Sequence, residues 1–416
     1  MKICLVSDYL PVYHEKWSGA ELLCFRLSQM ILDEGNNEVA FITTESKSKE
    51  KPENVFVAPA LLSRSGKFFK LFPFDFLSII PILKILIKIK PDIVHINAKI
   101  LFFPTLMAAK ILRLPTVFTV PDYWIVCPLN ILVKPSGEIC TDFQGAHCFN
   151  CFPIGALQQI EKMVPDIFKE AVAFVRSKIF NFMIDQLDSI VVLSNTSKKR
   201  LEAYGIPGKK ISVIYHYRMD KRQVDEGYAR DRAPEILFVG SFHRHKGMHV
   251  VVEAFHHVLK EFPDAFLTVI GSGDANYKKE IEKSVEALKL KNNIMFSGQQ
   301  NNEEVARLIS KSEVVIVAEQ WPNDFGPMIL VEAKALGKPV VAGRIGAIPE
   351  FISDGKDGLL GIYDDPKEYA NNIIWMLRHP EEREKMGNNA KKSVKFLYGK
   401  EMSEKIMQLY ESLKFR

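Results

Sequence analysis

The chain alternates short apolar runs with longer stretches in which apolar residues recur every three or four positions. Short apolar runs bounded by turn residues are typical of buried parallel strands, and the longer spacing is typical of helices. In the first half, the predicted strands are Lys2–Ser7, Glu38–Thr43, Asp92–Ile96, Thr116–Val120 and Ser189–Leu193. Helical segments such as Glu21–Asp33 and Pro104–Leu112 separate them. This alternation predicts a doubly wound parallel sheet.

The pattern changes over 217–233, which is dense in charge and nearly devoid of aliphatic residues. We interpret this segment as a linker between a domain at 1–216 and a domain at 234–390. The second series of strands is expected at Ile236–Val239, Phe266–Ile270, Ile294–Ser297, Val314–Val317 and Pro339–Ala342. Its helices are expected at Met248–Glu261, Lys278–Leu288, Asn302–Ile309, Met328–Leu336 and Pro366–Leu377. Ligands of such sheets bind at the carboxyl ends of the strands.

The composition is that of an ordinary globular protein, since 47% of the 416 residues are hydrophobic and 25% are charged. It excludes a disordered chain, collagen and a coiled coil. The net charge of +5 is too small to indicate nucleic acid as a partner, although it leaves room for a local basic patch. The segment Met1–Asp8 predicts a first strand rather than a secretory signal. Because Phe76–Ile89 is interrupted by Pro81 and two lysines, we expect a cytoplasmic protein without a spanning helix.

Two acidic residues flank the point where a loop is expected to enter the helix Met328–Leu336. Asp324 should lie on the loop that carries Gly326, at the carboxyl end of a strand, and Glu332 on the first turns of the helix. Carboxylates placed there can accept hydrogen bonds from sugar and ribose hydroxyls, and the N–H groups of the helix start can bind phosphate. The alternative is a helix-start acid plus a surface glutamate. Spacing alone does not decide between them.

The segment DFGPMILVEAKALGKPVV (324–341) resembles the C-terminal signature of the retaining GT-B glycosyltransferases of family 4. That signature is an acidic residue, seven others, Glu-Ala and then Gly-x-Pro-Val, and Asp324 replaces its usual Glu. The segment FVGSFHRHKG (238–247) resembles the family's Gly-Arg-x-x-x-x-Lys-Gly loop, whose Arg and Lys neutralise the donor diphosphate. Ser241 replaces that Arg, and Arg244 is the candidate substitute. The alternative for Lys246 is an exposed loop lysine.

Three shorter segments extend the resemblance. Gly271-Ser-Gly273 would permit a close backbone approach, although a plain turn is equally compatible. The segment GRIGAIPE (343–350) resembles a Gly-Gly-x-x-Glu turn beside the donor sugar, or is only a connection between a strand and a helix. The segment WSGAE (17–21) resembles the Gly-Gly-Ala-Glu loop, in which amides at a helix start, here at Gly19, face the donor phosphates.

The segment TVPDYWIVCP (119–128) resembles the Thr-x-His-Asp-Tyr-Trp-x-x-Cys-Pro segment of one subgroup. The family's active-site His is Pro121 in this chain. Asp122, at the carboxyl end of a predicted strand, is therefore the candidate to face the acceptor hydroxyl. The alternative is that Asp122 caps the following turn. His95, in a segment that resembles the family's Pro-Asp-x-x-His strand, is expected to pack rather than react.

Four of the six cysteines fall in one short stretch with the spacing C-x12-C-x7-C-x2-C: Cys127, Cys140, Cys148 and Cys151, with His147 alongside. The set is typical of a closed tetrahedral zinc site, and the x2 pair is its strongest element. The alternatives are a disulfide, which a reducing cytosol disfavours, and cysteines without metal. We expect structural rather than catalytic zinc, because no position stays open for water.

The segment Arg64–Lys90 carries six basic residues, one acid and many large apolar side chains. This mixture suits a segment that lies on an anionic membrane surface. The alternative is a buried helix with solvated lysines. The membrane interpretation favours a lipid-linked acceptor and a peripheral location on the inner face of the membrane.

The resemblance covers about residues 1–400 and implies two Rossmann-like doubly wound domains, an interdomain cleft and a C-terminal helix (391–416) that crosses back to the first domain. It implies retaining transfer of a sugar from a UDP-sugar or GDP-sugar to an acceptor hydroxyl, without an obligatory metal. This hexosyltransferase-type activity would serve the synthesis of a polysaccharide or lipid-linked oligosaccharide. The implied catalytic residues are Asp122, Lys246 and Asp324. The implied donor-binding residues are Gly19, Ser241, Arg244, Lys246, Gly271, Gly326 and Glu332.

Two other functions stay open. One is a catalytically decayed scaffold or binding protein, since Pro121 and Ser241 replace two polar groups of the family's site. The other is an isomerase of the UDP-sugar 2-epimerase type, which has a similar fold but would lack the acidic-x7-Glu signature.

Overall fold

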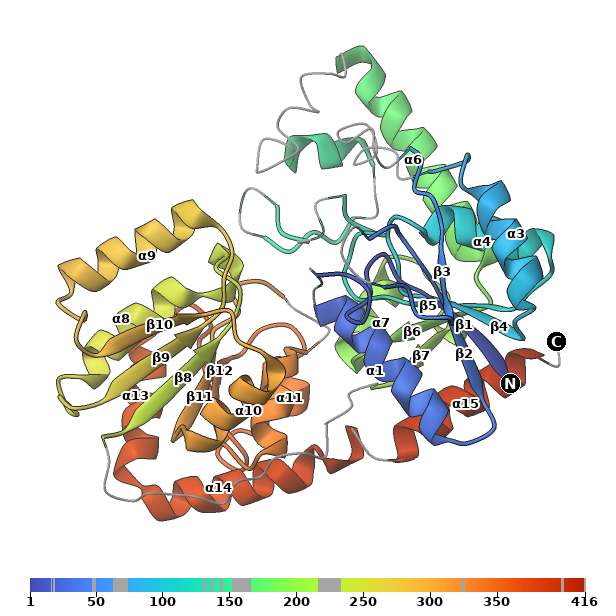
Figure 1. Ribbon diagram of the computed structural model, residues 1–416. Helices are drawn as coiled ribbons and strands as arrows, with labels where there is room; N and C mark the ends of the chain where they lie inside the picture. Colours follow the sequence, from blue (N-terminus) through green and yellow to red (C-terminus); the bar gives the residue numbers. More distant parts are fainter. Residues whose placement is uncertain are drawn as a thin grey trace. The chain divides into compact units, whose positions relative to one another are not determined.

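The computed structural model divides the chain into two compact units, Met1–Arg218 with Gly399–Arg416, and Met219–Tyr398 (Figure 1). The residues described run from 1 to 414, except 16, 18, 47–49, 63–73, 129, 131, 135, 137, 143–144, 152–165, 216–232, 323–325 and 398–399. The predicted linker 217–233 lies outside the described residues, apart from Ala233. The predicted cleft between the domains stays a prediction.

The first unit is built on a seven-stranded sheet with the order β3-β2-β1-β4-β5-β6-β7, all of whose neighbours are parallel. The strands are β1 Lys2–Val6, β2 Glu38–Thr43, β3 Val55–Val57, β4 Ile93–Ile96, β5 Thr116–Thr119, β6 Ser189–Val192 and β7 Ile211–Val213. The helices are α1 Gly19–Asp33, α3 Ile79–Ile89, α4 Phe102–Ile111, α6 Asp166–Gln186, α7 Asn195–Ala203 and α15 Lys400–Lys414, with 3-10 turns η2 Ala146–Cys151 and η3 Gly208–Lys210. The central strands β4, β5 and β6 are buried along their whole length, as in sheets covered on both faces.

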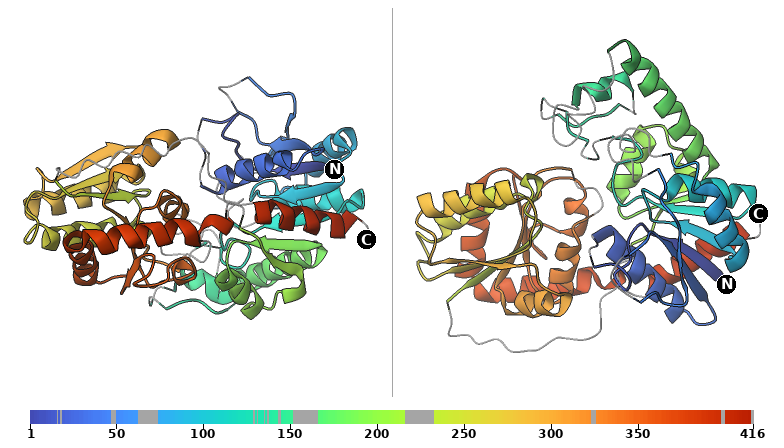
Figure 2. Two further views of the ribbon diagram at one scale, coloured as in Figure 1. Left: turned by 90° about the horizontal axis from the view of Figure 1, so that it is seen from below. Right: turned by 45° about the horizontal axis from the view of Figure 1, so that its top comes forward.

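The helix α15 completes the core of this first unit, where it lies beside α1 (Figure 2). Tyr410 is fully buried, and its hydroxyl lies 2.5 Å from Nδ1 of His95 on β4. The other ring nitrogen of His95 lies 2.7 Å from the hydroxyl of Thr119 on β5. Because both ring nitrogens have partners in the core, His95 has a structural role, as predicted. At the end of α15, Lys414 pairs with Asp92 at 3.0 Å.

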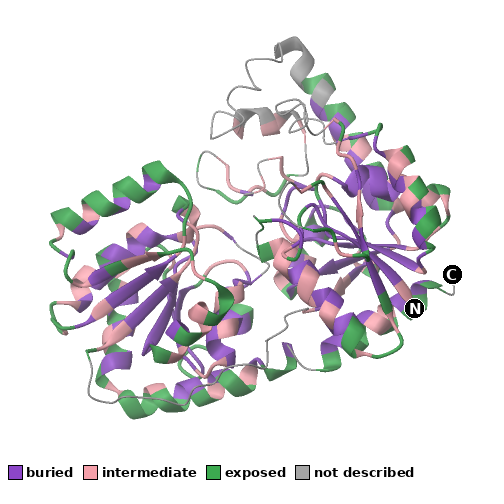
Figure 3. Ribbon diagram, viewed as in Figure 1, coloured by how far each residue is buried: buried purple, intermediate pink, exposed green. Residues whose placement is uncertain are grey.

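The second unit contains a six-stranded parallel sheet with the order β10-β9-β8-β11-β12-β13. Its strands are β8 Glu235–Val239, β9 Phe266–Ile270, β10 Ile294–Gly298, β11 Val314–Val317, β12 Val340–Gly343 and β13 Leu359–Gly361. Its helices are α8 Met248–Val258, α9 Ala275–Ala287, α10 Asn302–Lys311, α11 Met328–Ala335, α12 Ile348–Phe351, α13 Pro366–Arg378 and α14 Pro380–Ser393, with 3-10 turns η4 Arg244–Lys246 and η5 Lys395–Leu397. The strands form the buried centre of the unit (Figure 3).

The strand order reverses once in each sheet, between β1 and β4 in the first unit and between β8 and β11 in the second. Such switch points open a crevice outside the carboxyl ends of the two strands, where ligands of doubly wound sheets bind. The two predicted α/β domains are therefore confirmed. The loops that follow β8 and β11, and those that follow β1 and β4, are the places to look for function.

Candidate functional site

The loop after β8 lies directly against the loop after β11 in the second unit. Gly247, which follows η4, has a φ of 72°, and a Cβ atom built on it would lie 1.8 Å from the carbonyl oxygen of Ala318. Only glycine combines this left-handed conformation with such a close approach. The contact brings Lys246 next to Glu319, the residue that follows Ala318 beyond β11.

Lys246 and Glu319 form an ion pair at this switch point. Nζ of Lys246 lies 2.5 Å from Oε1 of Glu319, and Nε1 of Trp321 donates a 2.9 Å hydrogen bond to the other carboxylate oxygen. Glu319 is 3% exposed, whereas the side chain of Lys246 is 25% exposed. A buried carboxylate with both oxygens engaged fixes the position of a cation that still reaches solvent. Lys246 is therefore more than the exposed loop lysine of the alternative interpretation.

His245 packs beside this pair. Its ring centroid lies 5.1 Å from that of Trp321, and its carbonyl accepts a 2.7 Å hydrogen bond from the amide of Gln320. Burial, together with the positive charge of Lys246, lowers the pKa of His245 to about 4. The imidazole is therefore neutral near pH 7, so Lys246 carries the positive charge at this point of the loop.

Ser241 and Arg244 lie on the same loop but differ in their surroundings. Ser241 is half-buried, and its carbonyl accepts a 2.8 Å hydrogen bond from the amide of His243. Arg244 is exposed, and its guanidinium lies 2.7 Å from Glu280 on α9. An exposed ion pair of this kind is worth little and is easily exchanged. The role of Arg244 as the substitute cation stays a prediction.

Gly271 brings the loop after β9 to the same place. Its φ is 146°, and a Cβ atom on it would lie 1.9 Å from the carbonyl oxygen of Gly240. A Cβ on Gly273 would lie 2.8 Å from the amide nitrogen of Phe242. The segment Gly271-Ser-Gly273 therefore allows a close approach between its own backbone and that of the loop after β8. Glycines of the loops after β8 and β9 thus allow the backbones of the loops after β8, β9 and β11 to contact one another.

The helix α11 begins where the sequence predicts. Gly326 has a φ of 73° and precedes Pro327, which caps the helix. Glu332 lies in the second turn and is half-buried. Asp324 lies outside the described residues. The next polar residue of the helix, Lys334, is fully buried and pairs with Asp357 at 3.0 Å, so it holds α11 in place.

In the first unit, carboxylates gather after β1 and β5. Asp8 is buried, and its carboxylate accepts hydrogen bonds from the amides of Lys99, Ile100 and Leu101, at 2.7, 2.8 and 3.0 Å, so it closes the loop after β4. Burial raises the pKa of Asp8 to about 6 despite these three donors. Burial also raises the pKa of Asp122, while the charge of Lys99 opposes the rise.

Asp122 caps a turn, as one of its two interpretations predicts. Its Oδ1 accepts a 3.1 Å hydrogen bond from the amide of Trp124. The negative charge of Glu21, on the first turn of α1, reaches both Asp122 and Asp8. The helix α1 begins at Gly19, as expected for the predicted phosphate-facing loop, although Ser18 lies outside the described residues. Capping does not exclude a role in chemistry, because the charges of Lys99 and Glu21 also act on Asp122.

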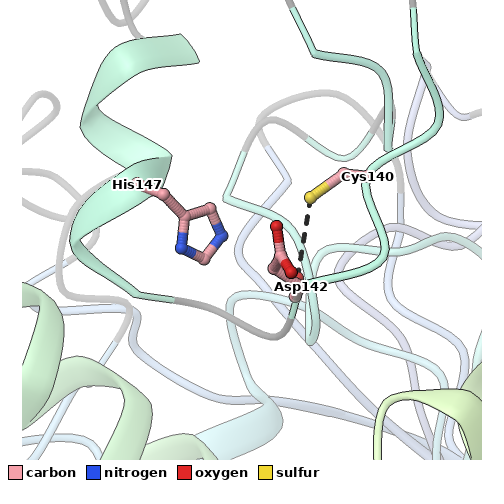
Figure 4. A group of neighbouring side chains, drawn as sticks. All are labelled: Cys140, Asp142 and His147. Carbon is pink, nitrogen blue, oxygen red and sulfur yellow. Dashed lines mark hydrogen bonds between the residues drawn. The ribbon is translucent and has the colours of Figure 1, made fainter.

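The four predicted metal-binding cysteines line one small cavity in the loop after β5: Cys127, Cys140, Cys148 and Cys151. All six cysteines of the chain are free thiols, which disagrees with the disulfide alternative. Asp142 and His147 line the same cavity. The side-chain atoms of Cys140, Asp142 and His147 that could bind a metal ion lie within 4.8 Å of one another (Figure 4).

Comparison with known protein families gives one match for each half of the chain. Residues 17–217 match the family described as Glycosyltransferase Family 4, and residues 220–393 match Glycosyl transferases group 1. The first half of the chain is therefore similar to family 4 and the second half to group 1, two families of glycosyltransferases. The two α/β units of the chain are similar to the two domains of the GT-B fold.

Curated relatives of the chain agree with these matches. It is 29% identical over 245 residues to N-acetyl-alpha-D-glucosaminyl L-malate synthase of Bacillus anthracis, an alignment that covers 57% of this chain and 62% of the relative. It is 29% identical over 187 residues to D-inositol 3-phosphate glycosyltransferase of Corynebacterium urealyticum, which covers 44% of this chain and 43% of the relative. The alignments thus span about half the length of these relatives.

The fold of the chain is also that of Anabaena Alr3699/HepE, solved in complex with UDP-glucose. The two structures superpose with a TM-score of 0.71 and 16% identity, over 99% of this chain and 100% of the other. Identity at this level shows a shared fold.

Two residues of the candidate site were not found by the sequence analysis. Glu319 and Asp8 both come two residues after a buried strand at a switch point. That position was the signal that could have found them, because strands next to a switch point carry the ligand-facing loops. Their partners could not be found in this way, since Lys246 lies 73 residues before Glu319.

Proposed function

We propose that this protein transfers a sugar from a nucleotide diphosphate sugar to an acceptor hydroxyl and retains the anomeric configuration. The observation that carries the proposal is the Lys246–Glu319 pair at the β8/β11 switch point, where three glycine-bearing loops meet. A buried anion that holds a half-exposed cation on a ligand-facing loop suits a site for a leaving group that gains negative charge. The crystallised UDP-glucose complex of Alr3699/HepE supports UDP as the nucleotide, with GDP as the other candidate.

The named residues divide the reaction between them. The ammonium of Lys246 neutralises the diphosphate as the bond to the sugar breaks, with Arg244 and the amides at Gly19 adding to the positive potential. Glu332 and Asp324 accept hydrogen bonds from hydroxyls of the donor, and Ser241, Gly271 and Gly326 allow its phosphates close to the backbone. Asp122 faces the acceptor hydroxyl. The leaving diphosphate takes up the proton of the attacking hydroxyl on the same face of the sugar, so no metal ion is required.

A lipid-linked acceptor fits the surface of the first unit. The segment 76–89, which leads into and forms α3, buries Ile82, Leu86 and Ile89 but exposes large apolar side chains: Phe76, Leu77, Ile80 and Ile87 are between 52% and 63% exposed. Lys84 and Lys88 are exposed on the same helix. Residues 63–73 of the predicted membrane segment lie outside the described residues.

The helix α6 adds to this apolar surface. Phe174 and Phe182 on α6 are 63% and 52% exposed. The rings of Phe74 and Phe180 lie 5.5 Å apart, which joins α6 to the chain segment before α3. Exposed apolar residues interleaved with lysines are typical of peripheral binding to an anionic membrane. Within the described residues, each helix is too short or too polar to cross a bilayer. We therefore propose a peripheral location on the inner face of a membrane and a role in polysaccharide or lipid-linked oligosaccharide synthesis.

The test is a panel of nucleotide sugars with and without membrane extracts as acceptor. Slow hydrolysis of one UDP- or GDP-sugar, together with thermal stabilisation by the matching diphosphate, is expected, because a ligand at 100 times its Kd adds about 2.7 kcal/mol of stability. The retained configuration is checked by NMR of the product. Nucleotide binding without any turnover would favour the decayed scaffold instead. Release of a free 2-epimer of the sugar would favour the isomerase.

A further inference from the structure

The cavity lined by the four cysteines of the first unit has the size and the chemistry of a metal site. Its volume is about 20 Å³, and Val126, Pro128 and Val133 complete its wall. A cavity of this size holds about one water-sized species, so it suits a single ion and is too small for an organic ligand. Sulfur, imidazole and carboxylate groups line it, and these are the donor types that zinc prefers.

The donors come from three separate parts of the loop, each held by the backbone. The amide of Cys127 donates to the carbonyl of Tyr123 at 2.7 Å. The amide of Cys140 donates to the carbonyl of Leu132 at 2.8 Å, beside the antiparallel bridge between Val133 and Ile139. Cys148 and Cys151 belong to the 3-10 turn η2. Three segments of the loop thus bring the four thiols to one cavity. Among the described residues the four sulfur atoms do not all lie within 4.8 Å of one another, so binding of an ion would draw them together.

The positive charges of two basic residues act on groups that line the cavity. Arg176 on α6 is 5% exposed, and its charge acts on Cys148 and Cys127. Lys134 lies 3.2 Å from Asp142, and its charge acts on Cys151. Four thiolates around one Zn²⁺ carry a net charge of −2, which is costly to bury without compensation. A buried guanidinium beside the sulfur atoms supplies that compensation.

We propose that Cys127, Cys140, Cys148 and Cys151 bind one Zn²⁺ as thiolates in a tetrahedral structural site. His147 and Asp142 lie next to the ion but do not coordinate it. Asp142 pairs with Lys134, and Nε2 of His147 lies 3.6 Å from Sγ of Cys148, where it can donate to a metal-bound thiolate. The amide of Gly145 donates to the same sulfur at 3.4 Å. Donors of this kind orient sulfur ligands and stabilise their negative charge.

The site would fix the part of the loop that adjoins Asp122. The side chain of Asn130 donates to Asp122, and the amide of Asn130 donates to the carbonyl of Cys127 at 3.0 Å. The hydroxyl of Tyr204, at the end of α7, donates to the carbonyl of Cys140. Zinc would therefore hold the surroundings of Asp122 in shape. This consequence rests on the proposed acceptor role of Asp122, whereas the metal site itself does not.

The first experiment measures zinc in the full chain, purified under reducing conditions and analysed by mass spectrometry of the metals. We expect about one zinc per chain in the wild type, as in closed tetrahedral sites. The double variant Cys148→Ser, Cys151→Ser should lose the zinc, and so should Cys127→Ser. Cys24→Ala, which removes a buried thiol of α1 in the same unit, is the matched control and should keep it. Wild type without stoichiometric zinc would overturn the proposal.

The second experiment distinguishes the four-thiolate set from a set built on Cys140, Asp142 and His147. His147→Ala and Asp142→Asn should each retain zinc, and Co²⁺ added to the chelated protein should give the intense sulfur-to-metal charge-transfer band of a thiolate-rich site. Loss of zinc in both of these variants, with retention in Cys127→Ser, would refute the proposed ligands. UDP binding should be the same in the wild type and the double cysteine variant, and its loss in both would contradict the proposed donor site without touching the metal site.

Discussion

Nζ of Lys246 lies 2.5 Å from Oε1 of Glu319, a carboxylate that is 3% exposed and also accepts a hydrogen bond from Trp321. The pair joins the loops after β8 and β11, so it contributes to folding, and we propose that its cation also acts on the leaving diphosphate. Variants must separate the two contributions, because removal of the cation leaves an anion buried.

Lys246→Met should lower both turnover and stability. Loss of a fixed cation at a leaving group costs about 10²–10³ in kcat, and removal of one partner from a buried ion pair costs about 3–5 kcal/mol of folding free energy. The double variant Lys246→Met, Glu319→Gln removes the stranded charge. It should recover much of the stability in urea titrations but none of the turnover. Recovery of turnover along with stability would show that Lys246 acts only through folding.

Glu332→Gln should weaken donor binding and turnover without a change in unfolding midpoint. Glu332 is half-buried in the second turn of α11, and a hydrogen bond to a charged group is worth about 1.5–3 kcal/mol. An effect of about tenfold or more on kcat/KM is expected. Glu253→Gln, an exposed carboxylate on α8, is the control. Equal kinetics in both variants would remove Glu332 from the donor site.

Gly271→Ala should disrupt the donor site, whereas Gly298→Ala should not. Both glycines have positive φ, at 146° and 69°, but a Cβ on Gly271 would lie 1.9 Å from the carbonyl oxygen of Gly240, and a Cβ on Gly298 meets nothing within 4 Å. Gly298→Ala should therefore cost only backbone strain of about 1–2 kcal/mol. Calorimetric titration of UDP distinguishes them, and equal UDP affinity in the two variants would contradict the proposed contact between loop and ligand.

The contribution of His245 to the free energy of unfolding should decrease on acidification. Its pKa is lowered to about 4, below its ordinary value of 6.5, so between these values the unfolded chain binds the extra proton. The contribution of neutral His245 to the free energy of unfolding is therefore fully present above pH 6.5 and is lost as the pH falls toward 4. Asp8, whose pKa is raised to about 6, works in the opposite direction in part of this range.

The difference in unfolding free energy between wild type and His245→Gln removes the contribution of Asp8, which both proteins share. This difference should decrease steadily from pH 6.5 to pH 4 in chemical denaturation. A constant difference over that range would mean that His245 is free to protonate in the folded protein.

Membrane binding should be peripheral and sensitive to salt. Lysines near an anionic surface contribute about 1 kcal/mol each, and this attraction fades as ionic strength rises. The wild type should float with anionic vesicles at low salt, and the variant Lys84→Glu, Lys88→Glu should not. Lys278→Glu, Lys279→Glu on α9 is a charge-matched control in the second unit. If the wild type does not float with anionic vesicles at low salt, the apolar surface does not bind anionic membranes.

Sequence patterns predicted most of the strands because buried parallel strands are continuous apolar runs. β2, β9 and β11 occur over the predicted residues, and β1, β4, β5, β6, β8, β10 and β12 differ by one residue at one or both ends. β3, β7 and β13, of three residues each, were missed, since so short a run shows no period. All three are the last or first strand of their sheet.

The site was harder to predict than the fold because its key contacts are long-range. Lys246 was identified through its motif, but its anion, Glu319, was not. The close approach of Gly271 to Gly240 depends on how two loops pack, which no local pattern contains. The cysteines, in contrast, were predicted by spacing alone to share one site, and they line one cavity.

The location of α15 has a consequence for synthesis on the ribosome. The core of the first unit includes Ile406, Tyr410 and Leu413 together with strands from the start of the chain. Domains generally fold as units in the order of translation. Here the unit that starts first cannot close until residues beyond 400 have left the exit tunnel, whereas Met219–Tyr398 can already have folded. The nascent first domain therefore lacks the contact between Tyr410 and His95 until α15 has been made.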